Sequence, residues 1–84
     1  MNDEINIGKL IHEQLKKDGR KVSWLAKEIY CDRSHLYRIF KQNSIDTGLL
    51  MRISNALNCD FFALLSSYYK KTGNQEPNML EITD

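Results

Sequence analysis

The 84-residue sequence has almost no proline, few glycines and no long apolar run. Its single proline, Pro77, lies close to the carboxyl end, and its four glycines form no glycine-rich phosphate loop. No apolar stretch approaches the roughly 20 residues that a membrane span needs. The first residues carry neither the basic nor the apolar block of a signal peptide. We therefore expect a cytoplasmic protein that does not enter the membrane.

Cysteine and histidine are equally sparse, and their spacing matches no common metal or redox site. Cys31 and Cys59 form no CxxC motif, so we expect both to be reduced and buried. His12 and His35 have no carboxylate or thiol at ligand spacing. The sequence also shows no nucleophile–base pair and no paired carboxylates. These absences predict a protein that is not an enzyme and that uses no metal, cofactor or small-molecule substrate.

The residues that are present fit one small helical domain. A chain of this length can bury one core, and its 42% hydrophobic and 27% charged residues are ordinary for a globular protein. Because β-branched residues never alternate before residue 79, we expect an all-α fold. Apolar residues recur at helical spacing in five segments, residues 5–17, 22–29, 33–41, 47–57 and 61–69. The domain is expected over residues 1–69, followed by a mobile tail over residues 70–84.

Two stretches repeat one pattern of helix end, turn and helix start. In Ile29–Asp32 and Leu57–Asp60, an aliphatic residue is followed by a turn residue, a cysteine and an aspartate. We expect each aspartate, and Asp46 before the fourth helix, to cap a helix, which is worth ~1 kcal/mol relative to alanine. Asn58 suits the left-handed conformation that often follows a helix end. Both cysteines are then expected to pack against the core.

Positive charge is concentrated in one central segment, although the net charge is only +1. Residues 16–41 contain eight basic residues against three acidic ones, whereas residues 42–84 contain three against five. Such asymmetry is typical of proteins that bind a polyanion. A solvated basic face without a partner explains the charge equally well, so charge alone does not decide.

The apolar spacing across the second and third predicted helices is more informative. Leu25 and Ile29 lie on one face of the second helix, and Leu36 and Ile39 line the third. Two short helices joined by so tight a turn must cross steeply, and the small side chain of Ala26 allows their backbones to approach. This is the helix-turn-helix pattern, whose second helix enters the major groove of DNA.

The sequence resembles the Cro and phage-repressor type of helix-turn-helix regulators. The likeness rests on Leu25-Ala26, on the run from Asp32 to Phe40 and on Leu50 to Leu57, within about Ile7 to Leu65. The resemblance implies a five-helix domain that binds double-stranded DNA, usually as a homodimer, and reads bases from the start of the third helix. A transcriptional regulator of bacterial or phage type is therefore expected.

Two positions depart from the pattern of that family. Tyr30 occupies the turn where family members often have glycine, so it must adopt a permitted backbone conformation at some cost. Val22 stands where many members have a glutamine that contacts phosphate. The backbone amide of Val22 can still serve that contact, but the side-chain contact is lost.

The outward face of the third helix carries the residues expected to read DNA. With Leu36, Ile39 and Phe40 inward, a recognition helix over about residues 33–42 would lie in the major groove. The expected base-reading residues are Arg33, Ser34, His35, Tyr37 and Arg38. The expected phosphate contacts are Lys21, Val22, Ser23, Lys41, Gln42, Asn43 and Ser44. The alternative is a solvated helix face with two arginines.

The last predicted helix is too apolar to hide every side against so small a core. Its expected role is a dimer interface, made by Phe61, Phe62, Leu65, Tyr68 and Tyr69. Alternatively, the tail folds back over it. Trp24 lies beside the buried face of the second helix, where packing against the first helix or the tail is the preferred interpretation. A protein-interaction module that uses Trp24 and residues 61–69 is the competing function.

Overall fold

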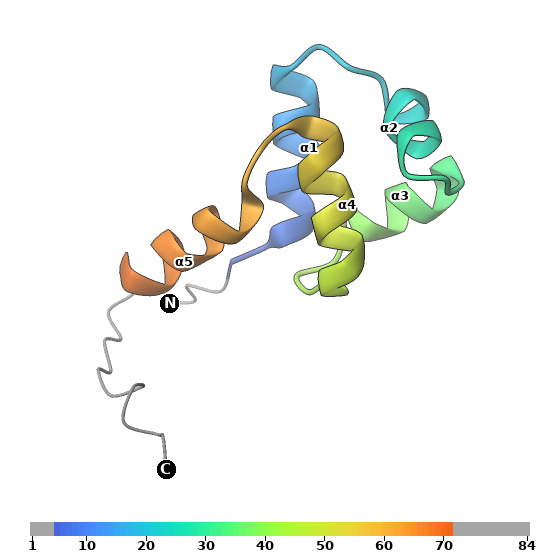
Figure 1. Ribbon diagram of the computed structural model, residues 1–84. Coiled ribbons are helices and arrows are strands. Elements are labelled where there is room, and N and C mark those ends of the chain that lie inside the picture. Colours follow the sequence, from blue (N-terminus) through green and yellow to red (C-terminus); the bar gives the residue numbers. More distant parts are fainter. Residues whose placement is uncertain (1–4, 72–84) are drawn as a thin grey trace.

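The computed structural model describes residues 5–71, and within this range the chain forms five α-helices and no strand (Figure 1). The helices are α1 (Ile7–Lys17), α2 (Val22–Glu28), α3 (Arg33–Ile39), α4 (Thr47–Leu57) and α5 (Phe61–Lys71). The all-helical prediction is confirmed for this part of the chain. The tail was expected to begin at residue 70, but residues 70 and 71 are the last two residues of α5. The rest of the expected tail, residues 72–84, lies outside the described residues.

Side-chain caps explain where three of the helices begin. Asn6 caps α1, because its Oδ1 accepts from the amide of Lys9 at 3.1 Å. Asp46 accepts from the amide of Leu49 at 2.9 Å, and Asp60 from the amide of Ala63 at 2.9 Å. The caps predicted for Asp46 and Asp60 are therefore confirmed. Each cap satisfies an amide that has no partner inside its helix.

The cap predicted for Asp32 is wrong in this structure. Asp32 occupies the N-cap position of α3, but its side chain makes no cap hydrogen bond. Only its backbone carbonyl takes part in the first turn, accepting from the amides of His35 and Leu36 at 3.1 and 3.3 Å. α3 thus begins with backbone hydrogen bonds alone, and the Asp32 carboxylate accepts none from its first-turn amides.

Four helix boundaries differ from the predicted ones, the smallest difference being at α2, which ends at Glu28 rather than at residue 29. α1 begins at Ile7 rather than residue 5, because Asn6 caps it, and α5 continues to Lys71. α3 ends at Ile39. The helix was predicted to continue to residue 41, and the recognition segment to residue 42. The amide of Gln42 donates to the carbonyl of Ile39, and the carbonyl of Gln42 accepts from the amide of Gly8 at 3.0 Å. The chain therefore leaves the helix in tight turns that dock it on α1.

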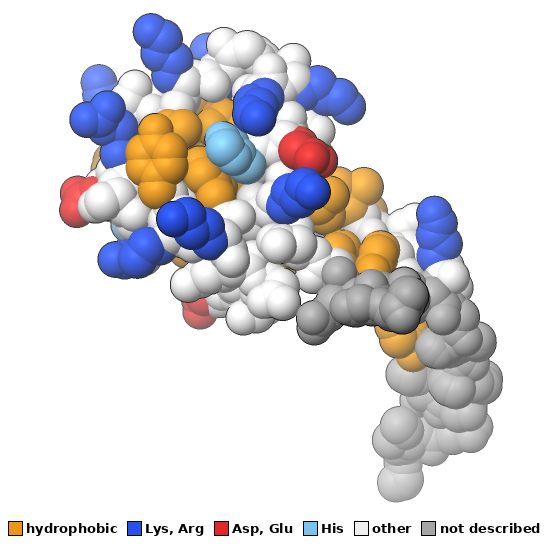
Figure 2. All heavy atoms as spheres, turned by 180° about the vertical axis from the view of Figure 1, so that it is seen from behind, with side chains coloured by type: hydrophobic (Ala, Val, Ile, Leu, Met, Phe, Trp, Pro, Cys, Tyr) orange, Lys and Arg blue, Asp and Glu red, His pale blue; other side chains and the backbone are white. Residues whose placement is uncertain are grey.

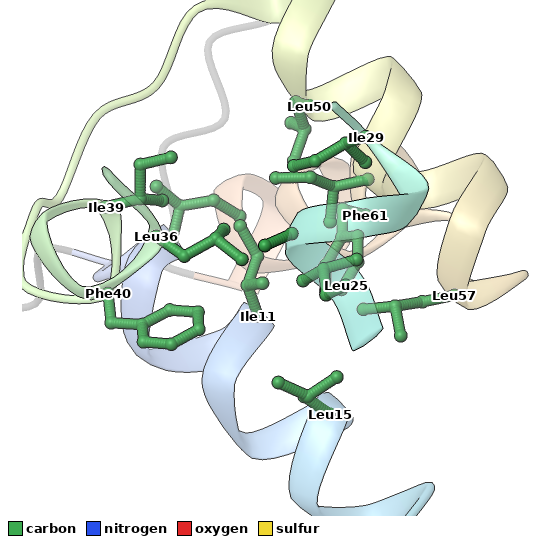
Figure 3. Close-up of a cluster of buried hydrophobic side chains, with 13 residues drawn as sticks. Ile11, Leu15, Leu25, Ile29, Leu36, Ile39, Phe40, Leu50, Leu57 and Phe61 are labelled. Carbon is green, nitrogen blue, oxygen red and sulfur yellow. The ribbon is translucent and has the colours of Figure 1, made fainter. Parts of the chain in front are cut away.

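All five helices contribute to one hydrophobic core (Figure 3). The buried residues are Ile7, Ile11, Leu15, Leu25, Ala26, Ile29, Leu36, Ile39, Phe40, Leu50, Ile53, Leu57 and Phe61. Burying one large aliphatic or aromatic side chain stabilises the fold by roughly 1.5–3 kcal/mol. In Figure 1, α1 and α4 lie between the α2–α3 pair and α5. α2 contacts both α3 and α4, so the short helix pair is held as a unit against the core.

The turn between α2 and α3 contains an unusual backbone conformation. Tyr30 adopts a φ of 56°, in the left-handed region, and its side chain is 91% exposed. The amide of Cys31 donates to the carbonyl of Ala26 at 2.9 Å, which closes the end of α2. Asn58 has a φ of 53° in the equivalent turn after α4, as the repeated sequence pattern predicts. Both turns thus use the same geometry, with asparagine at lower steric cost than tyrosine.

α1 and the end of α3 meet at Gly8 more closely than any side chain would permit. A Cβ at Gly8 would lie 2.7 Å from the carbonyl carbon and oxygen of Phe40, and would overlap the carbonyl oxygen of Ile39. These neighbours are backbone atoms, which cannot rotate away as a flexible side chain can. Gly8 is therefore required by the packing of α1 on α3.

We expect Gly8→Ala to destabilise the fold by about 1–3 kcal/mol, the usual cost of forcing extra atoms into a packed site. For a domain of this size, each kcal/mol lowers the melting temperature by roughly 4–8 °C. Gly48→Ala is a matched control, because Gly48 is also the second residue of a capped helix. There the new Cβ would meet only the Asp46 side chain, at 3.2 Å. Equal melting temperatures for the two variants, measured by circular dichroism, would show that the close approach is wrong.

Candidate nucleic-acid interface

The exposed side of α3 carries most of the predicted base-reading residues. Leu36 and Ile39 are buried, so the opposite side of this short helix faces solvent. The side chains that it exposes are Arg33, Ser34, Tyr37 and Arg38. As predicted, α3 has one buried apolar face and one exposed polar face. Two arginines, a hydroxyl and a phenol then lie together on one helix turn and a half.

His35 differs from the other four residues because it is only half exposed and already has a partner on α3. Its Nδ1 lies 3.1 Å from Nη2 of Arg38, one helical turn further along. Residues three apart lie next to each other on a helix surface, which makes this contact possible. The pair couples a predicted base-reading arginine to its neighbour.

Aromatic contacts tie the exposed face of α3 to α1. The His12 ring on α1 stacks on the Phe40 ring, with centroids 4.2 Å apart and an interplanar angle of 1°. Tyr37 meets the same Phe40 ring edge-on, at 5.9 Å and 89°. Offset or edge-to-face aromatic pairs contribute ~0.5–1.5 kcal/mol beyond the area they bury. Tyr37 is thus held at its base while 49% of its surface stays exposed.

A basic hollow lies where α1, the start of α2 and the start of α3 meet. We use the name basic hollow for the depression lined by His12, Leu15, Lys16, Arg20, Lys21, Val22, Ser23, Arg33 and Tyr37. It brings the predicted phosphate contacts of α2 beside two predicted base-reading residues of α3. Figure 2 shows Lys and Arg side chains gathered around the broad end of the molecule, on the face opposite to Figure 1. Four of the nine lining residues are basic, so the hollow favours an anion.

Lys16 and Arg20 line the hollow but were not among the residues predicted to contact DNA. The sequence places Lys16 at the end of the first helix, where a basic residue is explained by the helix dipole alone. Arg20 lies in the connection to α2, where no periodicity indicates its direction. The only signal for both was their position within the basic central segment.

Trp24 borders the same region and contacts Arg20. The Arg20 guanidinium carbon lies 4.3 Å from the centroid of the Trp24 ring, a cation–π contact. Trp24 itself is half-buried and packs against the core. Both residues also line a second depression that adjoins the basic hollow and shares Arg20, Lys21, Ser23 and Arg33 with it. The indole therefore holds Arg20 at the edge of the positively charged surface.

The remaining predicted phosphate contacts follow the end of α3. Lys41, Gln42, Asn43 and Ser44 are all exposed in the connection to α4. They lie beyond the carboxyl end of α3, whereas the basic hollow borders its amino end at Arg33. The two predicted groups of phosphate-binding residues thus flank α3 at its two ends.

α5 presents only part of the surface that the sequence predicted for a dimer. Phe61 is fully buried in the core, so its assignment to an interface is wrong. Leu65 and Tyr68 are half-buried, while Phe62 and Tyr69 are 37% and 51% exposed. Leu64, which the prediction omitted, is also exposed, at 43%. Phe61 is the first residue of α5, directly after the capping Asp60, and its side chain packs into the core.

Trp24 and α5 do not lie on one surface. In Figure 1, α2 and α5 occupy opposite ends of the molecule, with α1 and α4 between them. The two parts of the surface expected for a protein-interaction module therefore belong to helices at different ends of the domain.

The two thiols have the properties of packing groups. Both cysteines are free and half-buried, and Cys31 Sγ donates to the carbonyl oxygen of Asp32 at 3.6 Å. Burial raises the pKa of the Cys31 thiol above its usual value, and Asp32 raises it further. Burial likewise raises the pKa of Cys59, with Asp18 and Asp60 adding to the effect. At neutral pH both thiols stay protonated, which is the unreactive form.

Within residues 5–71, no group of three or more His, Cys, Asp or Glu side chains is arranged to hold a metal ion. None of the helices in that same range combines the length and the apolar character needed to cross a membrane. Comparison of the chain with protein-family models, with curated proteins and with solved structures found no match.

Proposed function

We propose that this chain is a sequence-specific double-stranded DNA-binding protein, a transcriptional regulator of the Cro or phage-repressor type. The observation that supports this best is the continuity of two surfaces. The exposed face of α3 runs directly into the basic hollow, and Arg33 and Tyr37 belong to both. A helix face with polar and cationic side chains beside an anion-attracting depression has the arrangement that groove binding requires.

The size of α3 is compatible with the major groove. An α-helix with its side chains is about 10–12 Å in diameter, and the groove is about 12 Å wide. Arg33 and Arg38 would bond the two acceptors on the edge of a guanine, which suits the planar guanidinium. Ser34 would reach a base or a phosphate, and Tyr37 would pack on a thymine methyl group. The basic hollow and residues 41–44 would bind phosphates on either side of the groove.

If basic side chains neutralise phosphates, duplex binding must weaken steeply with salt because bound counterions are released. With about 4–6 phosphate contacts per subunit, the logarithm of the binding constant should fall against the logarithm of salt concentration with a slope of roughly −4 to −5 for each bound subunit. Lys16→Ala and Arg20→Ala should each reduce the size of that slope by about 1 per bound subunit. The measurement is fluorescence anisotropy with labelled duplexes.

Lys9→Ala and Lys71→Ala provide matched charge controls. Both residues line a groove between α1 and α5, away from the basic hollow. Their removal should leave the slope unchanged. A flat salt dependence, or no duplex binding at low salt, would refute the proposed function. Equal effects of all four variants would refute the placement of the phosphate contacts in the basic hollow.

The proposed base readers can be tested separately from the phosphate contacts. Arg33→Ala should relax preference at one base pair, by ~1–3 kcal/mol for a good bidentate contact, while the fold stays intact because this side chain is exposed. Lys41→Ala should weaken all sequences about equally, since a phosphate contact carries no base preference. Selection of bound DNA from a random pool measures the base preference, and titration of individual duplexes measures the uniform loss of affinity. Wild-type preference in the Arg33 variant would exclude this residue as a reader.

We further propose a homodimer formed through α5. Phe62 and Tyr69 are exposed large side chains seven residues apart, and therefore on one side of α5, a helix at the opposite end from α2. Pairing there would leave the α3 face open, and two half-sites would give the specificity that one short helix lacks. A protein partner that covers this same apolar face is the second candidate function, and the exposed α5 residues favour it equally.

Phe62→Glu should give a folded monomer, because a carboxylate buried without a partner is costly at an interface. The monomer should bind the selected duplex more weakly than the dimer does. Phe62→Leu keeps the apolar character and should remain dimeric. Light scattering gives the mass, and circular dichroism confirms folding. If the wild-type protein is monomeric at high concentration, the homodimer proposal fails and a different partner for α5 becomes the remaining candidate.

A further inference from the structure

His35 and Arg38 form a side-chain pair on the helix that is proposed to read DNA. Nη2 of Arg38 lies 3.1 Å from Nδ1 of His35, within hydrogen-bonding distance. His35 is half-buried on α3, whereas Arg38 is exposed. The imidazole is thus placed between the body of the domain and a solvent-facing guanidinium.

The chemistry of the two groups determines which one donates. A guanidinium carries five N–H donors and no acceptor, so Nδ1 of His35 must be the acceptor. This hydrogen bond requires the tautomer in which Nδ1 carries no proton and the proton is on Nε2. Nδ1 is then occupied by Arg38 and is not available to a base. The remaining N–H groups of Arg38 stay free to bond the edge of a guanine.

We infer that His35 is a positioning residue, which orients Arg38 for base reading through its Nδ1. This inference rests on the proposed DNA-binding function. A long side chain that is held before binding loses less rotamer freedom when it binds. Removing the acceptor therefore costs discrimination at the base pair that Arg38 reads, and leaves phosphate contacts unchanged.

The substitution series separates a positioning role from a purely structural one. His35→Asn keeps an acceptor, because Oδ1 of asparagine is bonded to Cγ as Nδ1 is in histidine. His35→Gln moves the acceptor one bond further from the backbone, and His35→Ala removes it. A residue needed only for packing would not be rescued by asparagine while failing with glutamine.

The experiment measures the affinity of each variant for the selected duplex and for a duplex with the Arg38 base pair replaced. The ratio of the two affinities reports discrimination. We expect His35→Ala and His35→Gln to lower this ratio about 2- to 10-fold, the effect of freeing one long side chain. His35→Asn should keep the wild-type ratio, and all three should bind non-specific DNA with wild-type affinity. In an Arg38→Ala background, His35→Ala should cause no further loss of discrimination.

Failure of this inference can be distinguished from failure of the proposed function. If the wild-type protein binds no duplex, both are overturned. If it binds with clear base preference and His35→Ala keeps the wild-type ratio, only the role of His35 is overturned. Nitrogen-15 spectra of the free protein test the pair without DNA, since Nδ1 should be the unprotonated nitrogen. A proton on Nδ1 would overturn the inference whatever the DNA measurements show.

Discussion

The close contact of α1 with the end of α3 at Gly8 is the constraint on which the rest of the structure depends. The amide of Gly8 donates to the carbonyl of Gln42, and the absence of a Cβ lets the two backbones meet. This contact determines where α3 ends and how its outward side is turned. It also brings His12 on α1 over Phe40, whose ring in turn supports Tyr37. The backbone contact at Gly8 is thus connected to the exposed face of α3 by the packed rings of His12, Phe40 and Tyr37.

The basic hollow is a product of the same arrangement. Lys16 comes from α1, and Arg33 from α3. Arg20 and Lys21 come from the connection that leads into α2, and the four converge only when α1 crosses the α2–α3 pair. Like charges near each other repel, by about 1 kcal/mol for a pair 4 Å apart in water. Under the proposed function, phosphates would turn that repulsion into attraction. The cation–π contact with Trp24 keeps Arg20 at this surface.

The two turns of the repeated pattern illustrate how similar local sequences meet different surroundings. Tyr30 and Asn58 both adopt positive φ, and both following cysteines pack half-buried with protonated thiols. The aspartates that follow behave differently. The side chain of Asp60 caps its helix, whereas that of Asp32 does not. Local sequence therefore predicts the course of the backbone better than it predicts the direction of an exposed carboxylate.

The sequence by itself determined the five helices, most of the residues that they bury and the outward face of α3. Apolar spacing is sufficient for this, because it requires only that one side of each helix be covered. It did not indicate that Phe61 belongs to the core, or that Lys16 and Arg20 lie beside Arg33. It also did not show that His35 pairs with Arg38. Those facts depend on crossing angles between helices and on rotamers, which are set by contacts between residues distant in sequence. The tertiary structure alone decided them, because packing selects one arrangement among many that the same periodicity allows.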